Sequence, residues 1–305
     1  MAPPPLLILC PPRSYSSVVC SMIGRHPELY GFPELLLFLG ETVEDMLRFC
    51  QQRHAGGEMF NPRPPGLLRA LAQINAQEQS AATIEQAYQW LLARKDWHVK
   101  QVFDHLLEGV APRIGVEKSP WLATAPSMLH RLHHAYPQAR YLHLTRHPVT
   151  AQTSMQEFYQ RLTPWQLPGL EGLGLADYCA RAWHDWHRNI MNFTATLPPV
   201  QVLRVRGEDL LDNADAHLPG LASWLGIRGD AEAIDAMKHP EDSPYAGFGP
   251  NGAKLSGYDP KFQADPRLRP SRPGPVGIEL PAEWNVAAPI RALVTELALE
   301  LGYGD

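Results

Sequence analysis

Short apolar runs alternate along the chain with longer segments whose apolar positions recur at helical spacing. The short runs predict β-strands at residues 6–10, 28–32, 114–118, 140–145 and 200–205. The longer segments predict α-helices at residues 16–25, 42–52, 65–76, 83–93, 124–135, 150–161, 175–197, 216–225, 231–239 and 281–301. Strands separated by helices predict an α/β fold with a central parallel sheet flanked by helices, in which ligands bind at the carboxyl ends of the strands.

Residues 240–281 depart from this alternation. They are rich in proline, glycine, aspartate and lysine and show little periodicity, which predicts a long ordered loop or flap. Loops of this length inside a compact domain are usually functional or disordered. The helix predicted at residues 281–301 has apolar positions on one face, and we expect it to dock against the rest of the fold. The chain shows no internal repeat, and its 305 residues suffice for one α/β domain, so we expect a single domain over residues 1–305.

Composition and charge exclude several classes of partner. A formal net charge of -5 argues against a general nucleic-acid or acidic-membrane binder, so any anion site must be a local basic spot. The 4 cysteines lack CxxC pairing and metal-ligand spacing, which predicts reduced, mostly buried thiols. His130, His133 and His134 have helical spacing but no carboxylate suitably placed, and we expect no metal site. With no signal peptide or membrane span predicted, we expect a soluble, cytoplasmic protein.

The first candidate anion site lies between the strand at 6–10 and the helix that follows. Its loop carries Arg13, Ser14, Ser16 and Ser17. A helix start offers unpaired N–H groups and the positive end of a dipole, and a planar guanidinium grips two oxygens at once. The pattern therefore favours phosphate or sulfate binding. An ordinary serine helix cap with a solvent-facing arginine is the alternative.

A second candidate anion site follows the strand at 140–145. Arg146 ends that strand, and Ser154 lies eight residues further on; the two reach the same rim if Pro148 starts the helix. A capped helix with an unrelated surface serine is the alternative. Two anion sites at the carboxyl ends of parallel strands predict a ligand with two separate phosphate-type groups.

Two further residues at strand ends are candidates for chemistry. Lys118, in the sequence Glu117-Lys118-Ser119-Pro120, would point into the same crevice and stabilise charge on a transferring group. Glu34 follows the second strand and precedes an apolar run, where a carboxyl group can have a raised pKa and act as a general base. The alternatives are a strand-end salt bridge of Glu117 and a helix-start acid at Glu34.

The order of these motifs resembles that of the PAPS-dependent sulfotransferases, and most closely the bacterial members, including those of polyketide pathways. PAPS is 3′-phosphoadenosine 5′-phosphosulfate. The resemblance rests on the loop at 12–17, on residues 117–120 and on Arg146-x-Pro148 with Ser154; segments at 24–35, 239–244 and 257–262 are also similar. It implies a P-loop-NTPase-like three-layer fold and metal-independent sulfuryl transfer from PAPS, with PAP as product. The acceptor it implies is a hydroxyl of a small-molecule or carrier-tethered substrate.

The resemblance also implies roles for individual residues. Glu34 would be the general base, as in the bacterial members; the cytosolic animal members use a histidine instead, which stays open as an alternative because no histidine of this chain is assigned to that role. Lys118 would lie beside the bridging oxygen of the donor. Cofactor-binding residues would be Arg13, Ser14, Tyr15, Ser16 and Ser17 around the 5′-phosphosulfate, Arg146 and Ser154 on the 3′-phosphate, and Lys254, Tyr258 and Lys261 in the closing flap. Arg13 would also stabilise charge during transfer.

One position departs from the family pattern. Tyr15 stands where the loop normally has glycine, so the turn must avoid a left-handed conformation or force a tyrosine into one. The ring would project into the acceptor pocket or stack on the ligand. This leaves an inactive PAP-binding homologue as an alternative function. A P-loop kinase is more remote because the loop lacks the GxxxxGK[ST] run. The apolar segment at 35–76, with Phe38, is expected to form an acceptor wall; oligomeric state stays open.

Overall fold

The computed structural model describes residues 2–52, 63–162, 170, 172–255 and 257–304. Within these ranges five strands form one parallel sheet in the order β2-β3-β1-β4-β5. They are β1 (Leu6–Leu9), β2 (Leu29–Gly31), β3 (Ile114–Lys118), β4 (Arg140–Thr145) and β5 (Val202–Arg206). The chain builds the sheet first on one side of β1 and then on the other. Because β1 lies where the strand order reverses, the carboxyl ends of β1, β3 and β4 open a crevice suited to a ligand.

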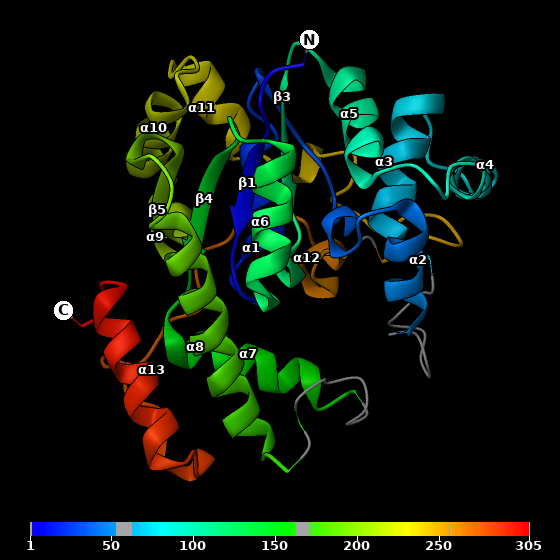
Figure 1. Ribbon diagram of the computed structural model, residues 1–305. Helices are drawn as coiled ribbons and strands as arrows, with labels where there is room; N and C mark the ends of the chain where they lie inside the picture. Colours follow the sequence, from blue (N-terminus) through cyan, green and yellow to red (C-terminus); the bar gives the residue numbers. More distant parts are fainter. Residues whose placement is uncertain (1, 53–62, 163–169, 171, 256, 305) are drawn as a thin grey trace.

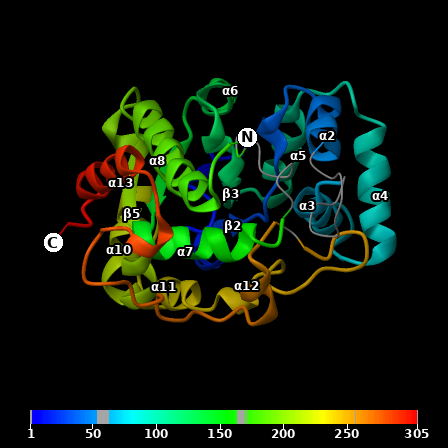
Figure 2. The same ribbon diagram turned by 90° about the horizontal axis from the view of Figure 1, so that it is seen from below.

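Helices cover both faces of the sheet. Figure 2 shows α6 and α8 on one side of the strands and α10 and α11 on the other. The described helices are α1 (Ser16–Ile23), α2 (Val43–Gln52), α3 (Pro65–Ala76), α4 (Ala81–Leu92), α5 (Val99–Val110), α6 (Pro126–Ala135), α7 (Pro148–Tyr159), α8 (Leu175–Thr194), α9 (Gly207–Asp212), α10 (Ala214–Leu225), α11 (Ala231–Met237), α12 (Pro260–Ala264) and α13 (Ala288–Glu300), as Figure 1 shows. The three layers confirm the α/β prediction.

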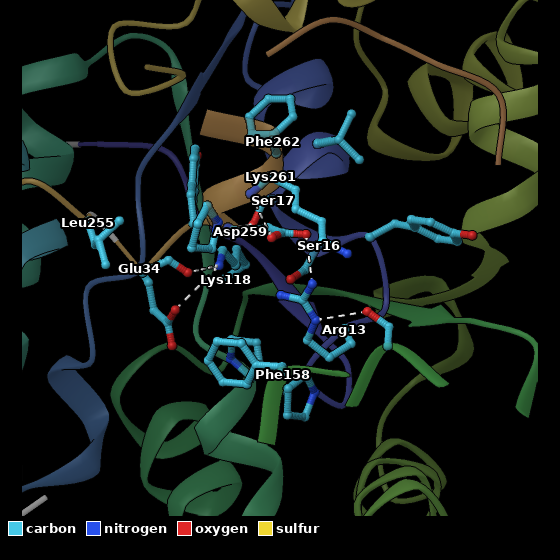
Figure 3. Close-up of a pocket in the computed structure, with 18 of the residues that line it drawn as sticks. Arg13, Ser16, Ser17, Glu34, Lys118, Phe158, Leu255, Asp259, Lys261 and Phe262 are labelled. Carbon is cyan, nitrogen blue, oxygen red and sulfur yellow. Dashed lines mark hydrogen bonds and ion pairs between the residues drawn. The ribbon is translucent and has the colours of Figure 1, made fainter. Parts of the chain in front are cut away.

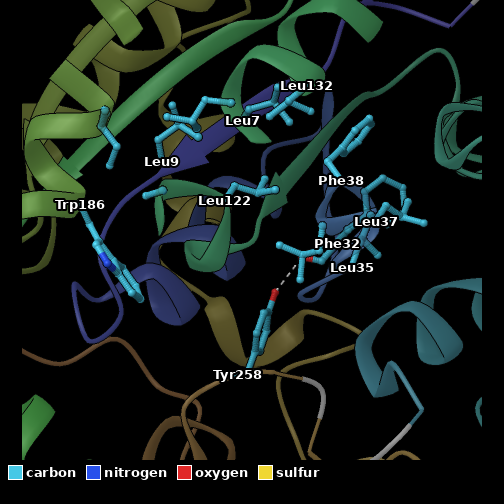
Figure 4. Close-up of a cluster of buried hydrophobic side chains, with 14 of the residues drawn as sticks. Leu7, Leu9, Phe32, Leu35, Leu37, Phe38, Leu122, Leu132, Trp186 and Tyr258 are labelled. Carbon is cyan, nitrogen blue, oxygen red and sulfur yellow. Dashed lines mark hydrogen bonds between the residues drawn. The ribbon is translucent and has the colours of Figure 1, made fainter. Parts of the chain in front are cut away.

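Alternation along β1 divides the core into two clusters. Leu6 and Ile8 pack with residues of α1, α9, α10 and α11 on one face of the sheet. Leu7 and Leu9 belong to the larger cluster on the other face, where Figure 4 shows them beside Leu122 and Leu132. Successive side chains of a strand point to opposite faces, so an unbroken apolar run is what a strand buried on both faces requires.

The predicted strands agree closely with those observed. The bounds of β3 and β4 match to the residue, while β5 begins at Val202 rather than at residue 200. The predicted helices at 124–135 and 281–301 begin late, at Pro126 and Ala288. A 3-10 turn at Pro120–Thr124 precedes the first of them. A 3-10 turn at Ala282–Trp284 and a left-handed Asn285, with φ of 52°, precede the second.

The sequence prediction omits α5, α9 and α12. For α5 the signal is present in the chain, because its apolar residues recur at helical spacing and all are buried: Val99, Val102, Phe103, Leu106, Leu107 and Val110. The helices α9 and α12 are one to two turns long, too short for a periodic pattern.

The flap and the C-terminal helix follow the predictions. In this segment, the described residues 240–255 and 257–281 are irregular apart from the turn at Pro240–Asp242 and α12. Helix α13 buries Ile290, Val294 and Leu297 and lies along α8, as Figures 1 and 2 show. The 4 cysteines of the chain are buried, free thiols, as expected. Among the described residues, no helix combines the length and apolar character that a bilayer crossing requires.

Candidate active site

A cavity of about 500 Å³ lies at the carboxyl ends of the strands, between the loop after β1 and the flap. Its lining brings together most of the site residues predicted from the sequence: Arg13, Tyr15, Ser16, Ser17, Glu34, Lys118, Arg146, Ser154, Tyr258 and Lys261. Figure 3 shows several of them pointing into the same space. Ser14 and Lys254 are not part of the lining.

The loop between β1 and α1 forms a cup at the start of the helix. Arg13 and Tyr15 both have left-handed backbones, with φ of 66° and 62°. Ser16 and Ser17 begin α1 and are buried, and no acidic residue lies in its first turn. The hydroxyl of Ser14 is fully buried and, among the described residues, has no hydrogen-bond partner. Unpaired helix-start N–H groups beside two serines suit a bound anion.

Arg13 connects the two predicted anion sites. Its Nε donates to Ser154 Oγ at 3.1 Å, and its Nη2 lies 2.9 Å from the carboxylate of Asp259. Its guanidinium also lies 5.3 Å from the ring centre of Phe158. The two sites therefore form one continuous pocket.

Arg146 also lines the pocket and contacts the main chain of the loop between β1 and α1. Its Nη1 donates to the carbonyl oxygen of Arg13 at 2.7 Å, and its Nε donates to Thr150 Oγ at 3.1 Å. Helix α7 begins at Pro148, as the interpretation of the Arg146–Ser154 spacing requires. Burial lowers the pKa of the Arg146 guanidinium from its usual value.

Tyr15 takes the left-handed backbone that the sequence left open. The Arg146 guanidinium lies 4.0 Å from the centre of its ring, and the ring lies close to Gly207. A side chain at Gly207 would approach Tyr15 Cδ2 to 2.7 Å, so glycine makes room for the ring. The Tyr15 hydroxyl accepts a hydrogen bond from the Arg272 backbone N–H at 3.3 Å. Cation–π contact with Arg146 offsets part of the cost of the strained backbone.

Glu34 and Lys118 form a buried pair. Lys118 Nζ lies 3.4 Å from Glu34 Oε2 and donates to the carbonyl oxygen of Gly257 at 3.1 Å. Figure 3 shows the two side chains meeting in the pocket. Gly257 has a φ of 75°, and a Cβ there would lie 2.4 Å from Glu34 Cβ. The flap thus packs directly on the carboxyl side chain, which only glycine allows.

The three predicted flap residues, Tyr258, Lys261 and Lys254, differ in where they lie relative to the pocket. Tyr258 is a buried residue of the pocket lining. Its hydroxyl donates to the Phe32 carbonyl at 3.2 Å, the contact drawn in Figure 4, and Lys118 Nζ lies 5.0 Å from its ring centre. Lys261 is at the rim and pairs with Glu157 at 2.9 Å. Lys254 is exposed outside the pocket, 5.9 Å from the ring centre of Phe248.

Sequence reasoning missed several pocket residues. Asp259 and the flap arginines, Arg267, Arg269 and Arg272, line the cavity, as does Phe158. The three arginines, close together in a proline-rich segment, were a readable basic signal. For Asp259 the sequence contains no such signal, because only the fold brings residue 259 next to residue 13.

The segment expected to form the acceptor wall lines the cavity only in part. From the segment 35–76 the cavity takes Leu36, Phe49, Cys50, Arg63 and Pro65, to which Trp121, Phe158 and Tyr159 are added from elsewhere. Phe38 does not line the pocket: it is buried in the core, 5.9 Å from Phe103 and 6.1 Å from Tyr136 between ring centres. Residues 53–62 of the predicted wall lie outside the described residues. Within the described ranges no group of three or more potential metal ligands occurs.

Comparison with known proteins identifies the fold and the family. A family model described as "Sulfotransferase family" matches residues 4–231. The sulfotransferase domain from the curacin biosynthetic pathway superposes with a TM-score of 0.73 at 24% identity, covering 99% of each chain. The sulfotransferase domain of the Synechococcus PCC 7002 olefin synthase gives 0.72 at 24% identity, covering 100% of this chain and 96% of that one. No curated protein matches significantly. These likenesses confirm the P-loop-NTPase-like fold.

Proposed function

The chain belongs to the sulfotransferase family, and we propose that it transfers a sulfuryl group from PAPS to a hydroxyl of a small-molecule or carrier-tethered acceptor. The observation that carries this proposal is the convergence of Glu34, Lys118 and the Arg13 loop on one pocket. A carboxylate base, a buried ammonium and an anion cup are the groups that such a transfer needs.

The residues present fit an anionic donor. The carboxylate of Asp259 lies 2.9 Å from Arg13 Nη2, and the Asp259 backbone N–H donates to Ser17 Oγ at 2.9 Å. The cup therefore accommodates an anionic group of this chain at the place proposed for the 5′-phosphosulfate. Arg146 and Ser154 would hold the 3′-phosphate, with the flap arginine Arg272 at the rim.

The mechanism follows from the positions of the side chains. PAPS, when bound, supplies an activated sulfuryl group on a phosphate leaving group. Glu34 would accept the proton of the acceptor hydroxyl as the oxygen attacks sulfur. Lys118 and Arg13 would stabilise the charge that grows on the leaving phosphate oxygen as its bond to sulfur breaks. General-base help is worth about 10²–10⁴-fold, and the rest comes from position and electrostatics.

The pocket wall indicates the class of acceptor. Leu36, Phe49, Trp121 and Phe158 face the cavity, and Arg63 is a cation within the same lining. An apolar or amphipathic alcohol, a phenol or a carrier-tethered chain fits such a wall better than a bare sugar. The guanidinium of Arg63 pairs with Glu85 at 2.6 Å and lies 4.0 Å from the ring centre of Tyr88.

A second candidate function follows from Tyr15. The tyrosine in the loop has a left-handed backbone, φ 62°, where the family pattern has glycine. This strain would favour a different function, in which the protein binds PAP but catalyses no sulfuryl transfer. The two candidates differ in turnover, not in nucleotide binding.

Calorimetry with PAP, ADP and ATP on the wild type and Arg146→Ala tests the donor site. We expect PAP to bind more tightly than ADP, and the preference to be lost in the variant because the 3′-phosphate loses its guanidinium. No preference for PAP over ADP in the wild type would remove the sulfotransferase proposal.

PAPS consumption, followed with water and then with a panel of apolar alcohols and phenols, separates the two candidate functions. We expect turnover in the wild type and a fall in kcat of about 10²-fold or more in Glu34→Gln, at unchanged PAP affinity. Full activity of Glu34→Gln would show that the base is another group. PAP binding without turnover would favour the inactive homologue.

A further inference from the structure

The turn that carries Glu34 is hydrogen-bonded to two polar residues at the carboxyl end of β3, Glu117 and Ser119. The backbone N–H of Leu35 donates to Glu117 Oε1 at 3.4 Å, and that of Leu36 donates to Ser119 Oγ at 3.1 Å. Ser119 Oγ itself donates to Glu117 Oε1. The two N–H groups immediately after Glu34 are thus tied to one connected pair of side chains.

The turn has a conformation that needs such support. Leu36 has φ of 60° and ψ of 11°, a left-handed backbone that disfavours a leucine by about 1–2 kcal/mol. Leu35 is buried and Leu36 lines the pocket, so the turn separates the core from the cavity. A strained turn of this kind persists only where the surrounding structure determines it.

The strand geometry of β3 explains why these residues act together. Neighbouring side chains on a strand point to opposite faces, so Lys118 and Glu117 leave β3 on different sides. Lys118 reaches the cavity and contacts Glu34, while Glu117 contacts the backbone that follows Glu34. One short segment therefore contacts both the carboxylate of Glu34 and the main chain that carries it.

Burial of the Glu117 carboxyl group is energetically unfavourable. It is 3% exposed, and burial raises the pKa of its carboxyl group to about 7. An unpaired buried carboxylate is strongly disfavoured, and the hydrogen bonds from Leu35 and Ser119 are what offset that cost.

We propose that Glu117 and Ser119 are positioning residues, which hold the turn at Leu35 and Leu36 so that the Glu34 carboxylate meets the acceptor hydroxyl. The proposal rests on the proposed role of Glu34 as base. It assigns a function to two members of the Glu117-Lys118-Ser119-Pro120 motif other than the lysine. Loss of the hydrogen bonds would let Glu34 move, and a misplacement of about 1 Å costs on the order of 10²-fold in rate.

The main test is Ser119→Ala, measured alone and in combination with Glu34→Gln. PAPS consumption with water as acceptor is the readout, so no acceptor need be known. Alone, Ser119→Ala should lower kcat about 10- to 100-fold, with the PAP dissociation constant within about twofold of wild type. In the Glu34→Gln background the same change should lower kcat less than about twofold further, because there is no base left to misplace.

A conservative substitution at Glu117 separates loss of the hydrogen bonds from misfolding of the protein. Glu117→Gln keeps an oxygen that accepts from Leu35 and Ser119 and should retain kcat near wild type, whereas Glu117→Ala should resemble Ser119→Ala. Ser80→Ala is the matched control, because Ser80 accepts the Thr83 N–H at the start of α4, away from the pocket. It removes a comparable hydrogen bond and should leave kcat unchanged.

Each outcome decides the proposal. Equal losses of kcat on Ser119→Ala with and without Glu34 would overturn it, since the serine would then act on stability or on the donor site. Unchanged kcat in both Ser119→Ala and Glu117→Ala would also overturn it. Full activity of Glu34→Gln is a different result: it would remove Glu34 as base and with it the group to be positioned. Hydrogen exchange at Leu35 and Leu36 gives an activity-independent check, with faster exchange expected in Ser119→Ala.

Discussion

The guanidinium of Arg13 lies 2.9 Å from the carboxylate of Asp259, a residue of the flap 246 positions further along the chain. The same aspartate caps α12, where its carboxylate accepts the Lys261 N–H. In this arrangement the carboxylate of Asp259 pairs with Arg13, the residue that we propose binds the phosphosulfate of the donor. We therefore expect donor binding to require movement of the Asp259 carboxylate away from Arg13.

We expect Asp259→Asn to tighten PAP binding on the order of two- to fivefold. The pair is partly exposed, and such ion pairs are worth up to about 1 kcal/mol, which sets the size of the effect. Asparagine still caps α12, so the helix start is kept. Calorimetry with PAP measures the change. Asp235→Asn, which removes one exposed charge on α11, is the control for net charge. Weaker binding by Asp259→Asn would contradict the competition.

Tyr15 is expected to support donor binding through its contact with Arg146. Tyr15→Gly relieves the left-handed strain but removes the ring that lies 4.0 Å from the guanidinium. Thermal stability should fall, because the ring also packs against the second core cluster, and the loss of this burial together with the cation–π contact exceeds the strain relief of about 1–2 kcal/mol. PAP affinity should fall about 3- to 10-fold, as expected for the loss of about 1 kcal/mol of guanidinium positioning.

Tyr15→Phe separates the ring from the hydroxyl. It keeps the contact with Arg146 and loses only the hydrogen bond from the Arg272 N–H, so its PAP affinity should match the wild type. If Tyr15→Gly bound PAP as tightly as Tyr15→Phe, the ring would have no role in the donor site.

A buried histidine pair should make the protein sensitive to acid. His143 Nε2 and His187 Nδ1 lie 2.9 Å apart between β4 and α8, and both rings are buried. Burial lowers the pKa of His143 to about 3 and that of His187 well below the usual 6.5. The unfolded chain binds protons there that the folded chain does not, so these groups contribute stability that is present above about pH 6.5 and lost as pH falls toward 3.

Urea unfolding at pH 7, 6 and 5 measures this effect when the wild type is compared with His187→Gln. The variant should lose less free energy of unfolding between pH 7 and 5 than the wild type. The comparison is needed because Glu117, with a raised pKa of about 7, acts in the opposite direction. Equal pH slopes in the two proteins would show that the pair is not buried in the neutral form.

Arg69 is expected to anchor the start of the flap. It is 3% exposed, and its guanidinium donates to the carbonyl oxygens of Pro244, Tyr245 and Gly247. Gln79 also donates to the Pro244 oxygen and Gln263 to the Gly247 oxygen. Arg69→Met keeps apolar volume but leaves the Tyr245 oxygen without this donor and removes a charged donor from the other two, which should cost about 1–3 kcal/mol in the free energy of unfolding. Urea unfolding tests this, with Arg94→Met as a control for an arginine bonded to a single carbonyl, that of Trp90. A loss below about 1 kcal/mol would contradict the anchoring role.

Local patterns predicted the scaffold well. The apolar runs of β1, β3 and β4 and the polar residues that end them are adjacent in sequence, so the strands, the loop at Arg13 and the positions of Lys118 and Arg146 follow from short segments. Alternation is a local property, and it also indicated a sheet buried on both faces. The apolar pattern of α5 is local in the same way, and the sequence contains it.

Contacts between distant segments were decided by tertiary structure. The sequence placed Phe38 in the acceptor wall and Lys254 over the nucleotide, whereas packing against Phe103 takes the first into the core and the flap path leaves the second exposed. No local pattern indicates that Asp259 meets Arg13.

By itself, the sequence of this protein determined the fold class, the order of its elements and the residue types that end the central strands. Those properties depend on periodicity and turn chemistry within a few residues. Only the tertiary structure decided that Tyr15 lies over Arg146, that Glu117 and Ser119 hold the turn after Glu34, and that a flap acid lies in the anion cup. Such contacts join residues far apart in the chain, and their geometry is set by the packing of the whole fold rather than by any one segment.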